Sequence, residues 1–420
     1  MYKVIVAHPG KQLSLKLAEA LYQKGYLYSY HTSVYFKQNS LFLRFISIFL
    51  SKENKKRAKN RRSSLIPDSK IISNFGFLGL ISLLLLRIDH KRLITNKWMN
   101  FVSDLFGQKV ARYAIKNKVD AVIMYDTNSR KAFEYLKAKA PNIKRIIDNS
   151  HPARSFLFEI YNNLNSSSGE FIKTLRAESD GFLFDKVKAD KFKHEILLAD
   201  INIVASSFSK KSILSCGFPN DKIIVAPYGI NSFKNPIVNK DFSKLRILFV
   251  GQVNQRKGIK QVLDAAVELK KQIDCTFSIV GSGMELYKEL YKPYYSFVDF
   301  YGRVTKTKLE HLYQSSNLFI FPTLGEGFGM VILEALSYGL PVICSKNCAG
   351  DDVIKDNFNG FVIDAGNSNS LVNHILNLHK DKNKLIQMSE NSKISSLDWT
   401  WEKYNQTIYE NLKIFLNINS

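Results

Sequence analysis

The sequence predicts an α/β fold made of two Rossmann-like, doubly wound domains, and three observations support this prediction. The chain has 420 residues, which is enough for two hydrophobic cores. Short apolar runs alternate with segments of helical spacing, as in strands joined by crossover helices. This alternation restarts at 245–250, after a polar stretch at about 230–244. We therefore place one domain at 1–230, a second at 231–398 and a terminal segment at 399–420.

The first domain is expected to contain strands at 3–7, 120–124 and 145–147, with helices at 12–23, 105–116 and 130–139. Gly25 follows the first helix and suits a helix end, because glycine tolerates a left-handed backbone. A loop at 148–151 follows the third strand. The segment 194–231 supplies a helix, a strand, a second helix that ends at Gly217, and a last strand.

The second domain is expected to contain strands at 245–250, 276–280, 297–300, 318–321, 342–344 and 360–363. Helices are expected at 258–272, at 306–315, after the loop at 322–329, and at 398–415. Glycine turns follow the first two strands of this domain. Its sheet should therefore be parallel, with loops gathered at the carboxyl ends of the strands.

The most informative segment is 320–341, IFPTLGEGFGMVILEALSYGLP. A strand ends at Pro322, a glycine-rich loop follows, and a helix-type run continues until Gly339. Two carboxylates, Glu326 and Glu334, lie eight residues apart around the start of this helix. A helix N-terminus offers free N–H groups to a phosphate, and glycines let a ligand approach the backbone closely.

This segment resembles the E-x7-E signature of retaining glycosyltransferases of the two-domain GT-B fold, family 4 (group 1). The resemblance implies that Glu326 and the amides of Gly327, Phe328 and Gly329 hold the donor sugar, and that Glu334 holds the ribose of the nucleotide. The alternative is an ordinary strand–loop–helix unit with two solvated glutamates. The same resemblance implies that the terminal helix packs back on the first domain.

The loop 251–258, GQVNQRKG, is the second motif that resembles the family. The family has an arginine after the first glycine and a lysine five residues later, and both face the donor diphosphate. Lys257 matches the lysine, whereas Gln252 replaces the arginine and brings no charge. Arg256 is a candidate for the missing cation, because negative charge builds on the departing diphosphate. Arg303 and Val304 match the segment that contacts the nucleotide base.

In the first domain, His151 follows a strand at the expected cleft, where the family often has a histidine near the donor sugar. A lone histidine is more often structural, but the end of a strand in an open α/β sheet favours a site. Asp148 is a weaker candidate. Gly10 is what remains of the family's paired glycines in the first turn, and its neighbours His8 and Lys11 are further candidates.

Other features receive no firm role. The turn at 281–283 is interpreted as structural with some donor contact, and the acids at 351–352 are left unassigned. No His, Cys, Asp and Glu residues have the spacing of a metal site. We therefore expect no cofactor and no metal, with a UDP-sugar as the expected donor substrate.

The net charge of +23 is concentrated near the N-terminus. Residues 1–100 contain 18 Lys/Arg and 4 Asp/Glu, which is 18 − 4, or +14. A basic cluster at 52–62 lies between apolar runs at 41–50 and 75–86, both shorter than the ~20 residues of a membrane span. This pattern favours a protein lying on an anionic membrane. The alternative is a pair of buried helices with a solvated basic loop between them. No nucleic-acid motif is present, so nucleic acid is not an expected partner.

Four scattered cysteines without a CxxC pair and a strand-like N-terminus indicate a cytoplasmic protein, which we expect to be peripheral on the inner face of the membrane. We expect a retaining transferase that moves a sugar to a glycan or lipid-linked acceptor, in polysaccharide or lipopolysaccharide assembly. The alternatives are a soluble enzyme making a small glycoside and a catalytically silent scaffold subunit. The donor base, the sugar and the acceptor cannot be read from these motifs.

Overall fold

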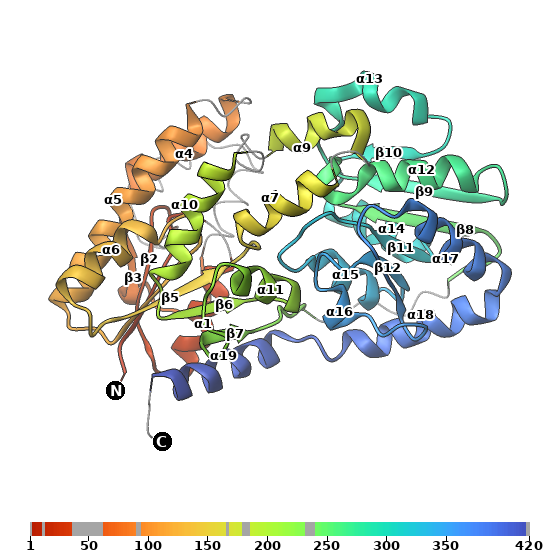
Figure 1. Ribbon diagram of the computed structural model, residues 1–420. Coiled ribbons are helices and arrows are strands. Elements are labelled where there is room, and N and C mark those ends of the chain that lie inside the picture. Colours follow the sequence, from red (N-terminus) through yellow and green to blue (C-terminus); the bar gives the residue numbers. More distant parts are fainter. Residues whose placement is uncertain are drawn as a thin grey trace.

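The computed structural model describes residues 2–10, 13–35, 62–89, 94–164, 168–178, 185–231 and 240–416. The expected apolar run at 41–50, Lys11 and nearly all of the basic cluster at 52–62 lie outside these ranges. The described chain forms two parallel sheets, each covered by helices (Figure 1). This confirms the predicted α/β fold class.

The first sheet has the strand order β3-β2-β1-β4-β5-β6-β7 among the described residues. Its strands are β1 Val4–Ala7, β2 Leu27–Thr32, β3 Ile71–Ser73, β4 Ala121–Tyr125, β5 Lys144–Asn149, β6 Ile201–Val204 and β7 Ile223–Val225. Its helices are α1 Ser14–Gln23, α4 Gly76–Ile88, α5 Thr95–Lys116, α6 Arg130–Lys139, α7 Arg154–Asn163, α10 Lys186–Leu197 and α11 Ser207–Ser215. Helix α9 Ile172–Glu178 lies against the second domain, where the Gln255 N–H donates to the Thr174 hydroxyl at 2.8 Å (Figure 1). All pairings within the sheet are parallel.

The second sheet has the order β10-β9-β8-β11-β12-β13. Its strands are β8 Leu245–Val250, β9 Cys275–Val280, β10 Asp299–Gly302, β11 Leu318–Phe321, β12 Val342–Ser345 and β13 Gly360–Ile363. Its helices are α12 Ile259–Leu269, α13 Lys288–Tyr291, α14 Lys306–Ser315, α15 Met330–Ser337, α16 Gly350–Val353, α17 Ser368–Lys380 and α18 Lys382–Ser396. Strands such as AVIMY in β4 and LFIF in β11 are buried along their whole length, because helices cover both faces.

Both sheets reverse their winding at one point, between β1 and β4 in the first and between β8 and β11 in the second. In open parallel sheets, ligands bind beyond the carboxyl ends of the strands at such a switch point. Gly258, at the start of α12, shows how tightly the second switch point is built. It has a φ of 73°, and an added Cβ would lie 2.0 Å from the Pro322 carbonyl oxygen. Only glycine lets the loop after β8 rest against the loop after β11.

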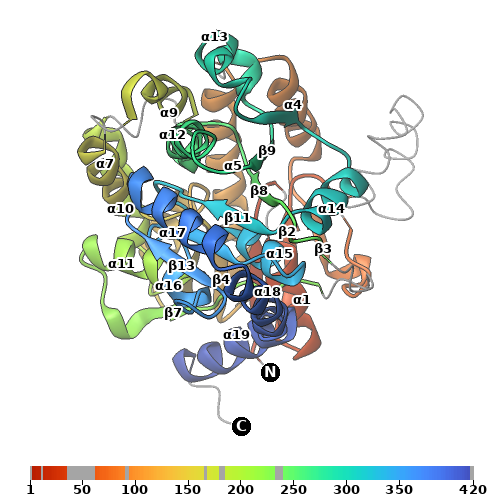
Figure 2. The same cartoon turned by 90° about the vertical axis from the view of Figure 1, so that its right-hand side faces the viewer.

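The last helix, α19 Trp401–Phe415, returns to the first domain and lies beside α1 in both views (Figures 1 and 2). The Tyr26 and Tyr409 rings stack with centroids 5.7 Å apart, and the Tyr2 hydroxyl donates to the Leu416 carbonyl at 2.6 Å. The chain passes from the first domain to the second after Ile230 and returns after Trp399. The two crossings lie side by side, because the Ile230 N–H donates to the Trp399 carbonyl at 2.9 Å. The domain boundaries themselves stay predictions.

Two local expectations were wrong. The strand expected at 145–147 extends to Asn149, so Asp148 lies within β5 and is buried instead of lying in a loop. The helix expected at 105–116 begins ten residues earlier, at Thr95. Its first turns mix polar residues with exposed apolar ones such as Phe101, so their spacing does not mark a buried helix.

Candidate active site

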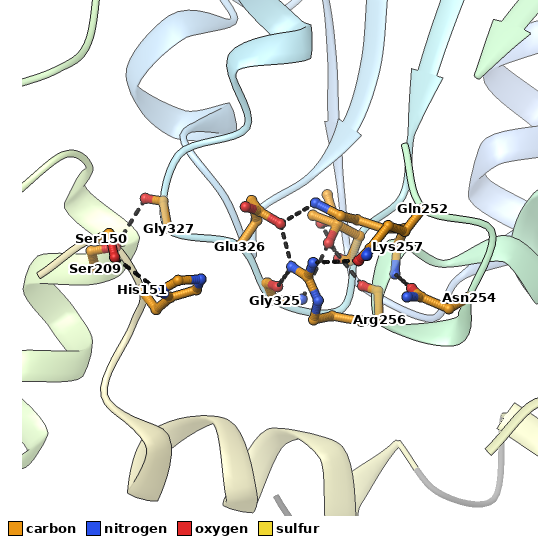
Figure 3. Close-up of polar contacts among 12 residues, drawn as sticks. Ser150, His151, Ser209, Gln252, Asn254, Arg256, Lys257, Gly325, Glu326 and Gly327 are labelled. Carbon is orange, nitrogen blue, oxygen red and sulfur yellow. Dashed lines mark hydrogen bonds and ion pairs between the residues drawn. The ribbon is translucent and has the colours of Figure 1, made fainter. Parts of the chain in front are cut away.

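The loops after β8 and β11 bring two cations to one carboxylate. The Arg256 Nη1 donates to Glu326 Oε2 at 2.5 Å, and the Lys257 ammonium donates to the same oxygen (Figure 3). All three side chains are less than one-fifth exposed. The sequence motifs 251–258 and 320–341 therefore meet in one site, although about seventy residues separate them.

These contacts fix the charge state of Glu326. Burial tends to raise its pKa, but the charges of Arg256 and Lys257 outweigh that effect and hold the pKa well below its usual range. The carboxylate is therefore ionised, and it pairs with both cations while offsetting only one of their two positive charges. A polyanion that reached the site would compete with Glu326 for the same two donors.

The turn that carries the cations is held by the backbone around it. Asn254 caps the 3₁₀ turn Gln255–Lys257 by accepting from the Lys257 N–H at 3.3 Å. The Arg256 carbonyl accepts from the Leu324 N–H at 2.8 Å and from the Thr323 hydroxyl at 2.9 Å. The cation loop is thus bonded directly to the loop that carries Glu326.

Gln252 contributes little to this network. Its amide oxygen lies 3.5 Å from the Arg256 Nη2, at the limit of a hydrogen bond, and the residue is exposed. Arg256, and not Gln252, is the residue that pairs with Glu326. Arg256, four residues later in the loop, therefore stays the candidate for the cation expected near the diphosphate.

Glu334 lies on α15, away from the two cations. The Tyr313 hydroxyl of α14 donates to its Oε2 at 3.0 Å. Burial raises the pKa of Glu334, and the Tyr313 hydrogen bond offsets part of that rise. The two glutamates of the signature thus have opposite electrostatic environments: Glu326 is held ionised by cations, and Glu334 has a single neutral donor.

The loop residues after Glu326 join the two domains. The Gly327 carbonyl accepts from the hydroxyls of Ser206 at 2.6 Å and Ser209 at 2.9 Å, both on the first domain. A Cβ on Gly327 would lie 2.2 Å from the Ser150 carbonyl oxygen, so only glycine permits this approach. Phe328 is buried against Tyr228, with ring centroids 5.3 Å apart, so its side chain packs at the domain junction.

Gly329 has a φ of 91° and precedes α15, whose first turn has no side-chain cap. Arg303 is exposed, with its Nη2 3.4 Å from the Ser282 hydroxyl, and Val304 packs at the edge of the core. The structure brings these two residues next to the 281–283 turn but gives them no contact with the Glu326 network.

His151 lies between Ser150 and the Glu326 loop (Figure 3). Its ring is 56 % exposed, and its Nδ1 lies 3.0 Å from the Ser150 hydroxyl and 3.3 Å from Asp126 Oδ2. Burial tends to raise the pKa of Asp126, but hydrogen bonding and the charge of His151 lower it to about 2. Asp126 therefore orients the ring and leaves Nε2 toward the cleft.

Sequence reasoning missed Asp126. The sequence did contain a signal for it, because Asp126 comes directly after the strand at 121–125. That strand is the parallel neighbour of the strand that precedes His151, and neighbouring parallel strands end at the same edge of the sheet. Ser206 and Ser209 were also missed. The unassigned acid Asp352 accepts from the Ser207 N–H at 3.0 Å and so helps to join the domains.

The remaining candidates from the first domain do not reach the cations. His8 is buried beside the Tyr125 ring, with centroids 5.2 Å apart, and the Gly10 N–H donates to its Nδ1 at 2.9 Å. Asp148 is buried, and its Oδ2 has no hydrogen-bond partner among the described residues. Burial raises its pKa to about 7, an effect that Tyr125 partly offsets and Asp126 reinforces.

Two parallel sheets whose switch points face each other define the GT-B class of transferase folds. The lipopolysaccharide outer core galactosyltransferase has a similar structure, with a TM-score of 0.63 and 16% identity over 98% of this chain and 99% of that one. Residues 232–395 match the family model of the glycosyl transferases group 1. The second domain therefore belongs to this family, which confirms the resemblance of its motifs; membership of family 4 in particular stays a prediction.

Curated relatives match over part of their length. The chain is 30% identical over 179 residues to an Escherichia coli UDP-Gal:alpha-D-GlcNAc-diphosphoundecaprenol alpha-1,3-galactosyltransferase, covering 38% of this chain and 46% of that protein. It is 27% identical over 217 residues to the Escherichia coli O-antigen chain mannosyltransferase B, covering 47% and 56%. The chain thus spans about half the length of the relatives it matches.

Proposed function

We propose that the protein is a retaining hexosyltransferase that moves a sugar from a nucleotide-sugar donor to a glycan or lipid-linked acceptor in cell-surface polysaccharide or lipopolysaccharide assembly. The observation that carries this proposal is the convergence of Arg256 and Lys257 on Glu326 at the second switch point. The names of the relatives support the acceptor class, because they act in O-antigen assembly and on a diphosphoundecaprenol-linked sugar.

In the proposed mechanism, the donor diphosphate takes over Arg256 and Lys257 from Glu326. Both cations then offset the negative charge that develops on the leaving diphosphate, and the uncapped N-terminus of α15 adds backbone N–H groups. The released Glu326 carboxylate accepts hydrogen bonds from hydroxyls of the donor sugar. Glu334 accepts from the ribose.

His151 would act from the opposite wall of the cleft. Asp126 holds its Nδ1, so its Nε2 can bond a sugar hydroxyl near the reacting centre. The acceptor hydroxyl would enter between the domains and bond to the anomeric carbon as the bond from that carbon to the diphosphate oxygen breaks. Its proton would pass to the departing diphosphate oxygen. We propose that the reaction needs no metal, because the two cations supply the charge that a divalent ion otherwise would.

The test is a panel of UDP-, GDP-, dTDP- and ADP-linked sugars, with binding and slow donor hydrolysis as readouts. We expect one donor, a UDP-sugar first among them, to be preferred, and turnover to be lost in Glu326→Ala. Chelation of divalent ions should leave the rate unchanged. The anomeric configuration of the released sugar, followed by NMR, tests retention. Absence of binding to every donor would contradict the proposal.

A further inference from the structure

Helix α4, with the sequence GFLGLISLLLLRI, is apolar but is not part of the core. Gly79 is its only buried residue among those whose side chains the structure describes. Helix α15, with MVILEALS, is similarly apolar and buries Ile332 and Leu333. The alternative that the 75–86 run is a buried helix is therefore wrong.

Three of the four exposed apolar residues of α4 form one stripe, whereas the fourth, Leu86, which is 40% exposed, lies on the opposite face. Phe77, Leu84 and Ile88 are 69%, 55% and 61% exposed, and they are spaced by seven and four residues, which places them on one face of a helix. Gly79 lies on the opposite face, where an added Cβ would be 2.8 Å from Ser33 Cβ. The stripe thus points directly away from the domain.

The start of α5 extends this surface. Ile94 and Phe101 are seven residues apart, and both are more than half exposed. Trp98 lies between them, with its ring centroid 6.2 Å from that of Phe101, and its Nε1 donates to the Ser82 hydroxyl of α4 at 3.0 Å. The two helices are thus joined to each other, and we call their exposed apolar residues Phe77, Leu84, Ile88, Ile94 and Phe101 the α4–α5 face. Exposed apolar residues gathered on neighbouring helices mark a candidate interaction site.

Charge decides which kind of partner fits this face. The stretch 69–103 contains five Lys/Arg and a single acid, Asp89. The Asp89 Oδ2 accepts from the N–H groups of Ile94 at 2.9 Å and Thr95 at 2.8 Å, so this carboxylate is used at the start of α5. Together with the excess of +14 in residues 1–100, this places the apolar face in a strongly basic part of the sequence. Anionic lipid offers both complements, an apolar interior and a negative surface.

We propose that the α4–α5 face docks the protein on an anionic lipid bilayer by inserting the stripe Phe77, Leu84 and Ile88 among the lipids. Among the described residues no helix is long and apolar enough to cross a membrane, so this helix lies in the interface. This inference deepens the proposed function, on which its biological meaning rests, although lipid binding itself can be measured without any sugar transfer.

The docking face is next to the expected acceptor side of the cleft. The Ser73 hydroxyl, just before α4, donates to the Ser33 carbonyl at 2.9 Å, and the Ser33 N–H donates to the Pro9 carbonyl at 3.2 Å. Pro9 follows β1, the strand at the first switch point. A bilayer under α4 would therefore present a lipid-linked acceptor close to the mouth of the site.

The test compares wild type with the triple variant Phe77→Ser, Leu84→Ser, Ile88→Ser in vesicle sedimentation. The vesicles contain phosphatidylcholine alone or in equal parts with phosphatidylglycerol. Wild type should bind the anionic vesicles more tightly, by roughly fivefold for each cation near the surface. The triple variant should bind them at least about tenfold more weakly, because three apolar side chains no longer leave water.

A matched control carries Leu286→Ser, Ile394→Ser and Ile414→Ser, three equally exposed residues elsewhere on the molecule. This variant should bind like wild type. Thermal unfolding checks that both variants are folded. Equal binding of wild type and the triple variant, or no binding of wild type to anionic vesicles, overturns the proposal. Self-association of wild type without lipid that the triple variant abolishes would assign the face to a second copy instead and also overturn it.

Donor hydrolysis separates this inference from the proposed function. The triple variant should hydrolyse a soluble nucleotide sugar at the wild-type rate, since no residue of the α4–α5 face contacts the Glu326 network. Lipid binding without donor turnover in wild type would refute the proposed function and leave the docking face intact. Donor turnover without lipid binding would refute the docking face and leave the proposed function intact.

Discussion

Replacing Glu326 by glutamine should tighten the binding of a nucleoside diphosphate while turnover falls. The amide keeps the shape of the side chain but removes the negative charge that pairs with Arg256 and Lys257. Each cation then meets an incoming diphosphate without a competing carboxylate. Turnover should fall by about a hundredfold or more, because a neutral amide holds the sugar hydroxyls less well in the transition state.

The size of the affinity gain follows from the ion pairs. Two unit charges about 4 Å apart interact by about 4 kcal/mol at an effective dielectric constant of 20. The three side chains retain between 12% and 19% of their exposure, so water reaches them, and solvent screening reduces this value. If a third of the interaction survives, removing the competitor strengthens binding by ~1.4 kcal/mol, which is about tenfold.

Titration calorimetry with UDP, GDP, dTDP and ADP measures this effect. Glu334→Gln is the matched control, because Glu334 contacts Tyr313 and neither cation, so its diphosphate affinity should not rise. The unliganded Glu326→Gln protein should also unfold more easily, since two partly buried cations lose their partner. A diphosphate affinity that is unchanged or weaker in Glu326→Gln would refute the idea that Glu326 and the donor share these cations.

Three further predictions concern the rest of the site. Asp148→Asn should stabilise the protein at pH 8 by on the order of 4 kcal/mol and change little at pH 4, because a raised folded-state pKa costs stability as pH rises from 3.8 to about 7; chemical denaturation at both pH values measures this, and equal effects would contradict it. Glu334→Gln and Tyr313→Phe should each raise the KM for the donor by about tenfold and leave kcat nearly unchanged, as expected for a group that binds ground and transition states alike; a fall in kcat alone would argue against ribose binding. Gly327→Ala should reduce turnover by at least about a hundredfold, because its Cβ would collide with the Ser150 carbonyl and hold the domains apart; wild-type activity would show that this contact is not needed.

The second domain could be predicted from sequence in detail because its signals are local. The strand 318–321 and the helix 306–315 agree with the structure at both ends. The structure brings Glu326 and Lys257 of the two motifs together, a contact that the sequence did not predict. Buried strands there are continuous apolar runs, and glycines mark the turns where the backbone must approach another loop.

The first domain was harder to read, for two physical reasons. Its site residues work through long-range pairs such as Asp126 with His151, and no spacing in the sequence reveals a contact across two strands. Apolar runs are also ambiguous there, since α4 has the composition of a core helix and yet faces outward. Composition gives the amount of apolar surface, but only the packing partners decide whether that surface is covered.

In the loop at 251–258, the positive charge beside Glu326 comes from Arg256 and not from position 252, where the family motif has its arginine. Gln252 is neutral and exposed, so its side chain supplies no positive charge to the site. Arg256 can do so because Leu324 and Thr323 bond its carbonyl to the Glu326 loop, which fixes where its side chain starts. Lys257 belongs to the same turn, and its N–H donates to the Asn254 side chain. Two adjacent residues reach one carboxylate because a 3₁₀ turn, bonded to Asn254 and to the Glu326 loop, carries them both, so the turn itself delivers the positive charge at this site.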